Sequence, residues 1–135
     1  MKKVFLIICC LTIFSCGSER VINDCFPGIS VNETINLSNP EFIDLQVPNG
    51  YTKTNISGRN ILIIRGNSSF KAFDLQCPEK DCTTAMDFDG LIIECVCSGQ
   101  QYNYLQGGKP QEGDGCFALE YNVTQTSPSS LQITR

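Results

Sequence analysis

The sequence predicts an all-β domain, and three observations lead to this prediction. Apolar and polar residues alternate in several short stretches, as they do in strands with one buried face. Turn residues, chiefly Gly, Pro, Asn and Asp, separate these stretches at short intervals. We find no stretch with a convincing helical period and no internal repeat. Short strands joined by such turns are typical of an antiparallel sandwich or barrel, which here carries two cysteine-bearing loops.

The first strands are predicted between residues 31 and 75. Two stretches alternate apolar and polar positions, and their apolar residues are Val31, Ile35 and Leu37, then Ile43, Leu45 and Val47. A turn follows at residues 48–50, which read Pro-Asn-Gly. Residues 61–64 form a short continuous apolar run that is rich in β-branched residues, which suits a buried strand. Residues 70–75 continue directly into the first cysteine loop.

The remaining strands follow that loop. Asp89-Gly90 predicts a hairpin turn between Phe88 and Leu91, because glycine accepts a positive φ. Residues 91–93 then lead into the second cysteine loop. The last two strands are separated by a turn at residues 127–130, and their apolar positions are Phe117, Leu119, Tyr121, Val123, Leu131 and Ile133.

The N-terminus predicts export and lipid attachment. Lys2 and Lys3 precede an apolar run that is too short to span a bilayer, and the sequence Ile-Phe-Ser before Cys16 ends this run as bacterial lipoprotein signals end. The alternative is a plain secretory signal with an incidental cysteine. We therefore expect a signal peptide at residues 1–15, a tether at 16–30 after the lipidated Cys16, and the folded domain at 31–135.

The charge of the chain excludes some partners. Without Lys2 and Lys3, eight basic residues face fourteen acidic ones, and the formal charge is −6. Nucleic acid binding needs a basic surface, as does a polybasic grip on anionic lipid. We therefore expect no nucleic acid partner, membrane association only through lipid on Cys16, and a bacterial cell-envelope location that faces the periplasm or the cell surface. The protein partner of such a module is unknown.

Cysteines are the main chemical feature of the chain. Cys9 and Cys10 lie in the predicted signal, and Cys16 is the predicted lipid site. An even number remains, which in an exported domain favours disulfides. These six residues are Cys25, Cys77, Cys82, Cys95, Cys97 and Cys116.

The two cysteine loops resemble those of the Rieske family. The first reads Cys77-Pro-Glu79, and the second runs from Cys95 through Ser98 to Tyr102. In the family, a Cys-x-His loop and a Cys-x-Cys-His-Gly-Ser-x-Tyr loop hold a 2Fe–2S cluster, with two histidines on one iron. This chain has no histidine, and Glu79 and Ser98 occupy the histidine positions. It is similar to the histidine-less Rieske-like lipoproteins of the Bacteroidetes.

The resemblance implies roles for the remaining loop residues. Cys77 and Cys95 match the cluster-ligand cysteines, and Tyr102 matches a tyrosine that donates to a ligand sulfur. Cys82 and Cys97 match the pair that forms a disulfide between the two loops in high-potential members. With the cluster site vacant, Cys77 and Cys95 would collapse into a second disulfide. The last two cysteines, Cys25 and Cys116, would then form a third.

The chemistry of the substituted positions argues against an ordinary cluster. A carboxylate at position 79 and a serine at position 98 are poor ligands for an iron that imidazole or thiolate normally binds. The signal also lacks the twin arginines of folded export. We expect no cofactor, with a 2Fe–2S cluster on Cys77 and Cys95 as the alternative. A four-thiolate metal site on Cys77, Cys82, Cys95 and Cys97 is a further alternative.

These features predict a non-enzymatic role. The usual general base is absent because the chain has no histidine. We expect a cluster-less, disulfide-stabilised Rieske-like module with an accessory or binding role. One competing hypothesis is electron transfer by a 2Fe–2S centre with altered ligation. Another is a thiol–disulfide oxidoreductase that works through Cys95 and Cys97, although the acidic neighbours Glu79, Asp81 and Glu94 would raise the thiol pKa values.

Overall fold

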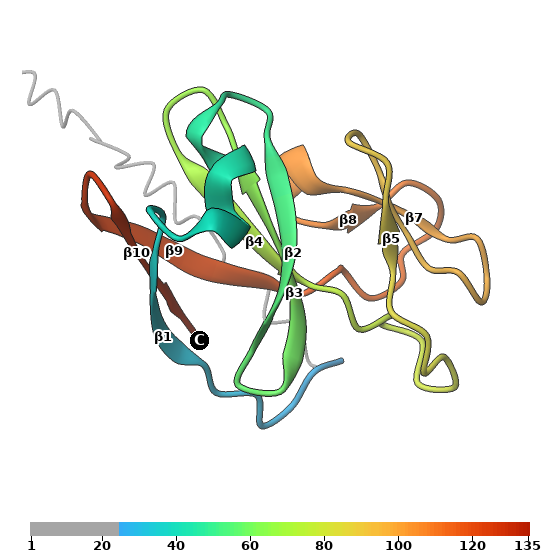
Figure 1. The fold of residues 1–135 in the computed structure, drawn as a ribbon. Helices are drawn as coiled ribbons and strands as arrows, with labels where there is room; N and C mark the ends of the chain where they lie inside the picture. Colours follow the sequence, from blue (N-terminus) through green and yellow to red (C-terminus); the bar gives the residue numbers. More distant parts are fainter. Residues whose placement is uncertain (1–24) are drawn as a thin grey trace, which may run out of the picture.

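The computed structural model of the chain describes residues 25–135 (Figure 1). The predicted signal peptide, the lipid site Cys16 and most of the predicted tether therefore lie outside the described residues. The described elements are ten strands and two short 3-10 helices. In chain order they are β1 (Asn32–Asn36), η1 (Pro40–Gln46), β2 (Tyr51–Ile56), β3 (Arg59–Arg65), β4 (Phe70–Asp74), β5 (Asp87–Phe88), β6 (Ile93–Glu94), β7 (Gln101–Asn103), η2 (Tyr104–Gln106), β8 (Lys109–Pro110), β9 (Glu120–Ser127) and β10 (Ser130–Thr134).

The strands form two antiparallel sheets. The larger sheet has the order β1-β10-β9-β4-β3-β2, and the smaller one has the order β5-β6-β7-β8. In Figure 1 the small sheet lies to one side of the large one, next to β3 and β4. The predicted all-β antiparallel architecture with two cysteine-bearing loops is therefore confirmed. The hairpin turn at Asp89-Gly90 is confirmed as well, because β5 and β6 pair antiparallel and Gly90 has a φ of +100°.

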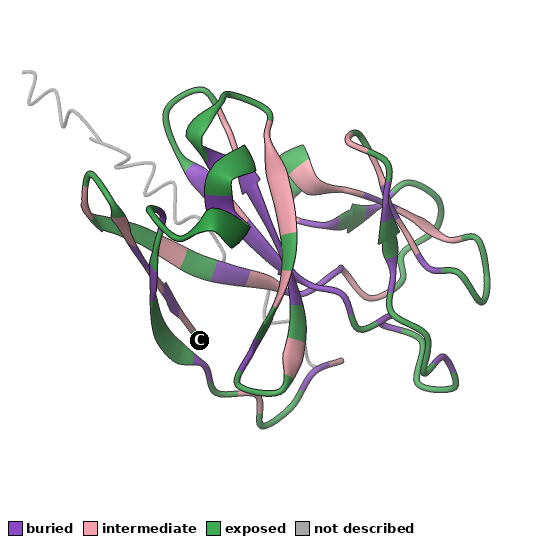
Figure 2. Cartoon of the chain, in the orientation of Figure 1, coloured by how far each residue is buried: buried purple, intermediate pink, exposed green. Residues whose placement is uncertain are grey.

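Strand β3 is buried, as its continuous apolar run predicted, and the burial extends to both faces. Ile61 and Ile63 belong to the core of the large sheet, whereas Leu62 and Ile64 belong to a second core. Adjacent residues of a strand point to opposite faces, so one strand supplies both cores. Figure 2 shows this central part of the large sheet as the most continuously buried region of the fold.

The second core joins the small sheet to the large one. It contains the buried residues Leu62, Ile64, Phe73, Leu75, Cys77, Cys82, Met86, Phe88, Ile93, Cys95, Tyr102 and Ala118. The rings of Tyr51 and Phe88 meet edge to face with their centroids 4.9 Å apart, and Phe88 meets Tyr104 in the same way at 5.6 Å. Three of the four loop cysteines, Cys77, Cys82 and Cys95, therefore belong to an apolar layer between the two sheets.

One predicted strand is wrong. The alternating residues Ile43, Leu45 and Val47 lie in and just after the 3-10 helix η1, not in a strand. Pro40 begins the helix, where its missing N–H costs nothing, and the buried Phe42 and Leu45 follow a three-residue spacing. Ile43 and Val47 are 58% and 57% exposed. The apparent alternation was therefore an accident of composition.

The described chain begins with residues that pack against the fold. Phe26 is buried in the core of the large sheet, and Cys25 and Ile29 pack against that core. The packed part of the chain therefore includes residues that the sequence assigned to the tether. Among the described residues, no helix has the length and apolar character needed to cross a membrane.

Candidate functional site

The first cysteine loop connects β4 to β5. Its base is closed by an isolated antiparallel bridge between Gln76 and Ala85, and by a hydrogen bond of 2.7 Å from Met86 N to Leu75 O. A turn lies inside the loop, where Cys82 N donates to Glu79 O at 3.1 Å. These contacts hold Cys77 and Cys82 against the second core.

The second cysteine loop joins β6 to β7. Cys95 N donates to Gln100 O at 2.9 Å, and Gly99 N donates back to Cys95 O at 2.8 Å. Gly99 has a φ of +73°, a conformation that glycine adopts without strain. This tight turn places Cys95 at the buried base of the loop and Cys97 near its exposed tip.

The six cysteines of the described chain form three disulfides. Cys77 pairs with Cys95, Cys82 with Cys97, and Cys25 with Cys116, the same pairs that the sequence analysis named. The Cα–Cα distances are 5.5, 5.9 and 6.1 Å in that order, within the usual range for disulfides. Two disulfides therefore join the first cysteine loop to the second.

These two disulfides differ in exposure. Cys77 and Cys95 are 1% and 0% exposed, and Cys82 is 5% exposed, whereas Cys97 lies at the surface. The sulfurs of Cys77, Cys82 and Cys95 all lie within 4.8 Å of one another. The site is thus a compact group of three buried sulfurs with a fourth, Cys97, leading to solvent.

The two residues that align with the Rieske histidines, Glu79 and Ser98, are not placed to bind a cluster. Glu79 and Ser98 are both exposed, and the Ser98 hydroxyl accepts a hydrogen bond of 3.2 Å from Gln100 N of its own loop. A 2Fe–2S cluster takes thiolates from cysteine, and sulfurs bonded to each other supply none. The donor set at these four positions therefore does not match that of a Rieske centre.

Tyr102 lies on β7 beside the cysteine group in the second core. Burial, together with the smaller effect of the negative charge of Glu79, raises the pKa of its phenol to about 12. The buried phenol therefore stays neutral well above the pH at which an exposed tyrosine ionises.

Sequence reasoning missed a buried polar group on the large sheet. Asp74, at the end of β4, is 1% exposed and forms an ion pair with Arg59 Nε. Its carboxylate also accepts from the Tyr121 hydroxyl at 2.6 Å and from Gln76 N at 2.7 Å. Because both carboxylate oxygens of Asp74 have hydrogen-bond partners, this group stabilises the fold rather than offering a reactive carboxylate. The only sequence signal was a lone acid in the apolar stretch 70–75.

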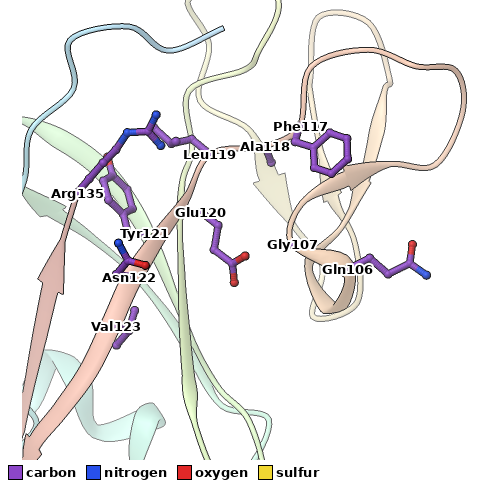
Figure 3. A pocket seen from close by; sticks show the side chains of 10 residues that line it. All are labelled: Gln106, Gly107, Phe117, Ala118, Leu119, Glu120, Tyr121, Asn122, Val123 and Arg135. Carbon is purple, nitrogen blue, oxygen red and sulfur yellow. The ribbon is translucent and has the colours of Figure 1, made fainter. Parts of the chain in front are cut away.

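A separate hollow of about 530 Å³ lies away from the cysteines (Figure 3). It is lined by Gln106, Gly107, Arg135 and residues 117–123, which lead into β9 and form its first part. The carboxylate of Glu120 faces this hollow but already accepts from Lys71 Nζ at 2.8 Å. The Tyr121 hydroxyl is likewise engaged by Asp74. The acidic and phenolic groups at this hollow are therefore already engaged in hydrogen bonds. We place the candidate site at the cysteine loops.

Comparisons with known proteins leave the chain without an assigned family. No family model matches it, and no curated protein matches it. Among solved structures, it is similar to the ferredoxin of carbazole 1,9a-dioxygenase from Nocardioides aromaticivorans IC177. That similarity has a TM-score of 0.45 and 16% sequence identity, and it covers 64% of this chain and 86% of the ferredoxin. At these values the similarity assigns neither a cofactor nor an activity to this chain.

Proposed function

We propose that this chain is an exported lipoprotein whose Rieske-like domain carries no cluster and acts as a disulfide-stabilised accessory or binding module. The observation that carries the proposal concerns the four residues that align with the cluster ligands of Rieske proteins. Cys77 and Cys95 are joined in a buried disulfide, while Glu79 and Ser98 lie exposed at the histidine positions. The frame of a cluster site is retained without its donors.

The two disulfides between the cysteine loops support a structural role for these loops. In the chain-entropy account, a cross-link that closes a loop of about 15 residues contributes about 3 kcal/mol. Cys82–Cys97 and Cys77–Cys95 span 15 and 18 residues, so both fall in this range. Their combined effect is to fix the two loops as a rigid surface rather than to hold a metal.

The anchor and the charge support a cell-envelope role. The predicted lipid on Cys16 would hold the domain at a membrane, and the acidic composition disfavours nucleic acid. The partner in this role is another protein of the envelope, whose identity the chain does not specify.

One purified sample tests this proposal. The full chain is isolated from membranes in air without reductant and analysed for iron, acid-labile sulfide and free thiols after denaturation. We expect colourless protein with no iron and with no free thiol at any of the six domain cysteines. Iron and sulfide in nearly equal amounts, with visible absorbance, would instead establish a 2Fe–2S centre with altered ligation.

A further inference from the structure

The two loop disulfides lie close enough to exchange with each other. The sulfurs of Cys77, Cys82 and Cys95 are mutually within 4.8 Å, although Cys82 belongs to a different disulfide from the other two. Disulfide exchange proceeds by attack of a thiolate on a disulfide sulfur. A free thiolate at Cys82 would need only a small loop movement to reach either partner sulfur.

Exposure separates the roles of the two bonds. Cys77 and Cys95 are 1% and 0% exposed, so an external thiol has no direct route to their bond. Cys97 lies at the surface, at the tip of the second cysteine loop, and is the exposed half of Cys82–Cys97. Attack at Cys97 would release the thiolate of Cys82, which is already inside the buried sulfur group.

We propose that Cys82 is an exchange thiol that carries reducing equivalents from the exposed Cys97 to the buried Cys77–Cys95 disulfide. The co-substrate is an external dithiol, such as the reduced pair of a thioredoxin-like protein. This activity differs from the Cys95–Cys97 redox pair considered from sequence, because the structure joins those two cysteines to different partners. It goes beyond the accessory function but rests on the same disulfides.

The steps balance in bonds and electrons. One thiolate of the dithiol attacks Cys97 Sγ, and Cys82 leaves as a thiolate. Cys82 then attacks Cys77 or Cys95, breaking their bond and forming a new disulfide with one of them. The second thiol of the dithiol closes its own disulfide and frees Cys97.

The free Cys97 thiolate completes the sequence by attacking Cys82. This attack re-forms Cys82–Cys97 and releases the last buried sulfur as a thiolate. The dithiol has then lost two electrons and two protons, and Cys77–Cys95 has become two thiols. Because the thiolate is the attacking species and a free cysteine thiol ionises only near pH 8.5, we expect exchange to be faster at mildly alkaline pH.

Two matched variants test the exchange without any reductant. Cys97→Ser leaves the free thiol of Cys82 inside the three-sulfur group, whereas Cys82→Ser leaves the free thiol of Cys97 outside it. Each variant loses the same disulfide, so both carry the same loss of cross-linking. In each, the remaining disulfide is mapped after incubation at mildly alkaline pH and acid quenching.

Peptide mapping can separate the three sulfurs of the group. Trypsin cleaves after Lys80, between Cys77 and Cys82, and a protease that cleaves before aspartate cuts at Asp87, between Cys82 and Cys95. In Cys97→Ser we expect a substantial fraction of Cys82 to be disulfide-bonded to Cys77 or Cys95. In Cys82→Ser we expect Cys77–Cys95 to stay intact and Cys97 to stay free.

Two results would overturn the proposal. The first is Cys97→Ser protein in which Cys82 is found only as a free thiol beside an intact Cys77–Cys95. The second test compares the reduction by dithiothreitol of the unsubstituted chain and of Cys82→Ser/Cys97→Ser. We expect the Cys77–Cys95 disulfide to open roughly tenfold more slowly in the double variant, because the route through Cys97 and Cys82 is lost. An equal rate in both proteins, each shown to be folded by its circular dichroism, would contradict the relay.

These results are distinguishable from failure of the proposed function. If the isolated chain contains iron and free thiols instead of disulfides, both ideas fail together. If it contains three disulfides but Cys82 never exchanges, the accessory module stands and the exchange activity alone is rejected.

Discussion

The Tyr121 hydroxyl on β9 donates to the buried carboxylate of Asp74 on β4 at a distance of 2.6 Å. Arg59 of β3 donates to the same carboxylate oxygen, so this one acid links three neighbouring strands of the large sheet. The first cysteine loop follows Asp74 in the chain. Gln76 N, at the start of this loop, donates to the other carboxylate oxygen of Asp74 at 2.7 Å. The position of the sulfur group therefore depends on this buried ion pair.

Removal of the Asp74 carboxylate should be strongly destabilising. Asp74→Ala removes the counter-charge of the partly buried Arg59 and the acceptor of the Tyr121 hydroxyl, and breaking a buried pair in this way costs about 3–5 kcal/mol. Tyr121→Phe removes one hydrogen bond to the carboxylate and should cost about 2 kcal/mol. Urea unfolding measures both free energies, and equal costs for the two variants would contradict the central role of Asp74.

The Cys25–Cys116 disulfide should stabilise the domain more than either loop disulfide. It closes a segment of 91 residues, for which the chain-entropy model gives about 4–5 kcal/mol. We expect Cys25→Ala/Cys116→Ala to lower the urea midpoint more than Cys82→Ala/Cys97→Ala does. The opposite order would mean that the native loops, rather than the unfolded chain, set the effect of these cross-links.

Gly50 should be the glycine of the η1–β2 connection that tolerates no side chain. A Cβ at this position would overlap the backbone carbonyl of Asp44 in η1, so Gly50→Ala must displace the helix and should cost about 3 kcal/mol. Gly58 provides the control, because it has a φ of +80° but open space around its Cβ direction. Gly58→Ala should cost only about 1 kcal/mol. Thermal or urea unfolding of the two variants tests the difference.

Tyr102 should ionise late in an alkaline titration. Burial, and to a smaller extent the charge of Glu79, raises its pKa from 10.0 to about 12. A pKa raised in the folded state means that the neutral phenol favours folding below pH 10, and that this stabilisation is lost as the pH rises through about 12. The ultraviolet absorbance of phenolate follows this ionisation.

Two variants assign that titration. Tyr102→Phe should remove an ionisation from the late part of the curve and leave the early part unchanged. Glu79→Gln should lower the pKa of Tyr102, because it removes a like charge. A Tyr102→Phe curve that loses its step near the ordinary tyrosine pKa would show that Tyr102 is not buried as the structure has it.

Cys16 should carry the lipid that holds the protein at a membrane. Cells that express the chain with labelled palmitate should incorporate label into the unsubstituted protein, and Cys16→Ser should abolish both the label and the recovery in the membrane fraction. Cys25→Ser is the control, because it removes a cysteine without touching the predicted lipid site. Label that persists in Cys16→Ser would support the plain secretory signal instead.

Some features of the fold could be predicted from local sequence alone. The run at residues 61–64 predicted a buried strand, and β3 supplies both cores. Asp89-Gly90 predicted the β5–β6 hairpin. In both cases the local preference and the tertiary packing agree, so neither overrides the other.

Other features could not be predicted in this way. The residues 43–47 alternate like a strand, yet Pro40 and the packing of Phe42 and Leu45 produce the 3-10 helix η1. Alternation over so few residues does not distinguish the two, and only the available space against β2 and the core decides. Likewise, a lone aspartate at position 74 gives no sign of its partners, which lie 15 and 47 residues away in the chain.

The sequence by itself determined the all-β class, the absence of histidine and the identity of the residues that align with the Rieske cluster ligands in the proposed resemblance. These follow from residue types and their spacing, which need no knowledge of contacts. Only the tertiary structure decided that the sulfurs of Cys77, Cys82 and Cys95 lie within 4.8 Å of one another while Cys97 stays at the surface. The physical reason is that two loops from different strands are packed against one apolar layer, and chain spacing does not encode that approach.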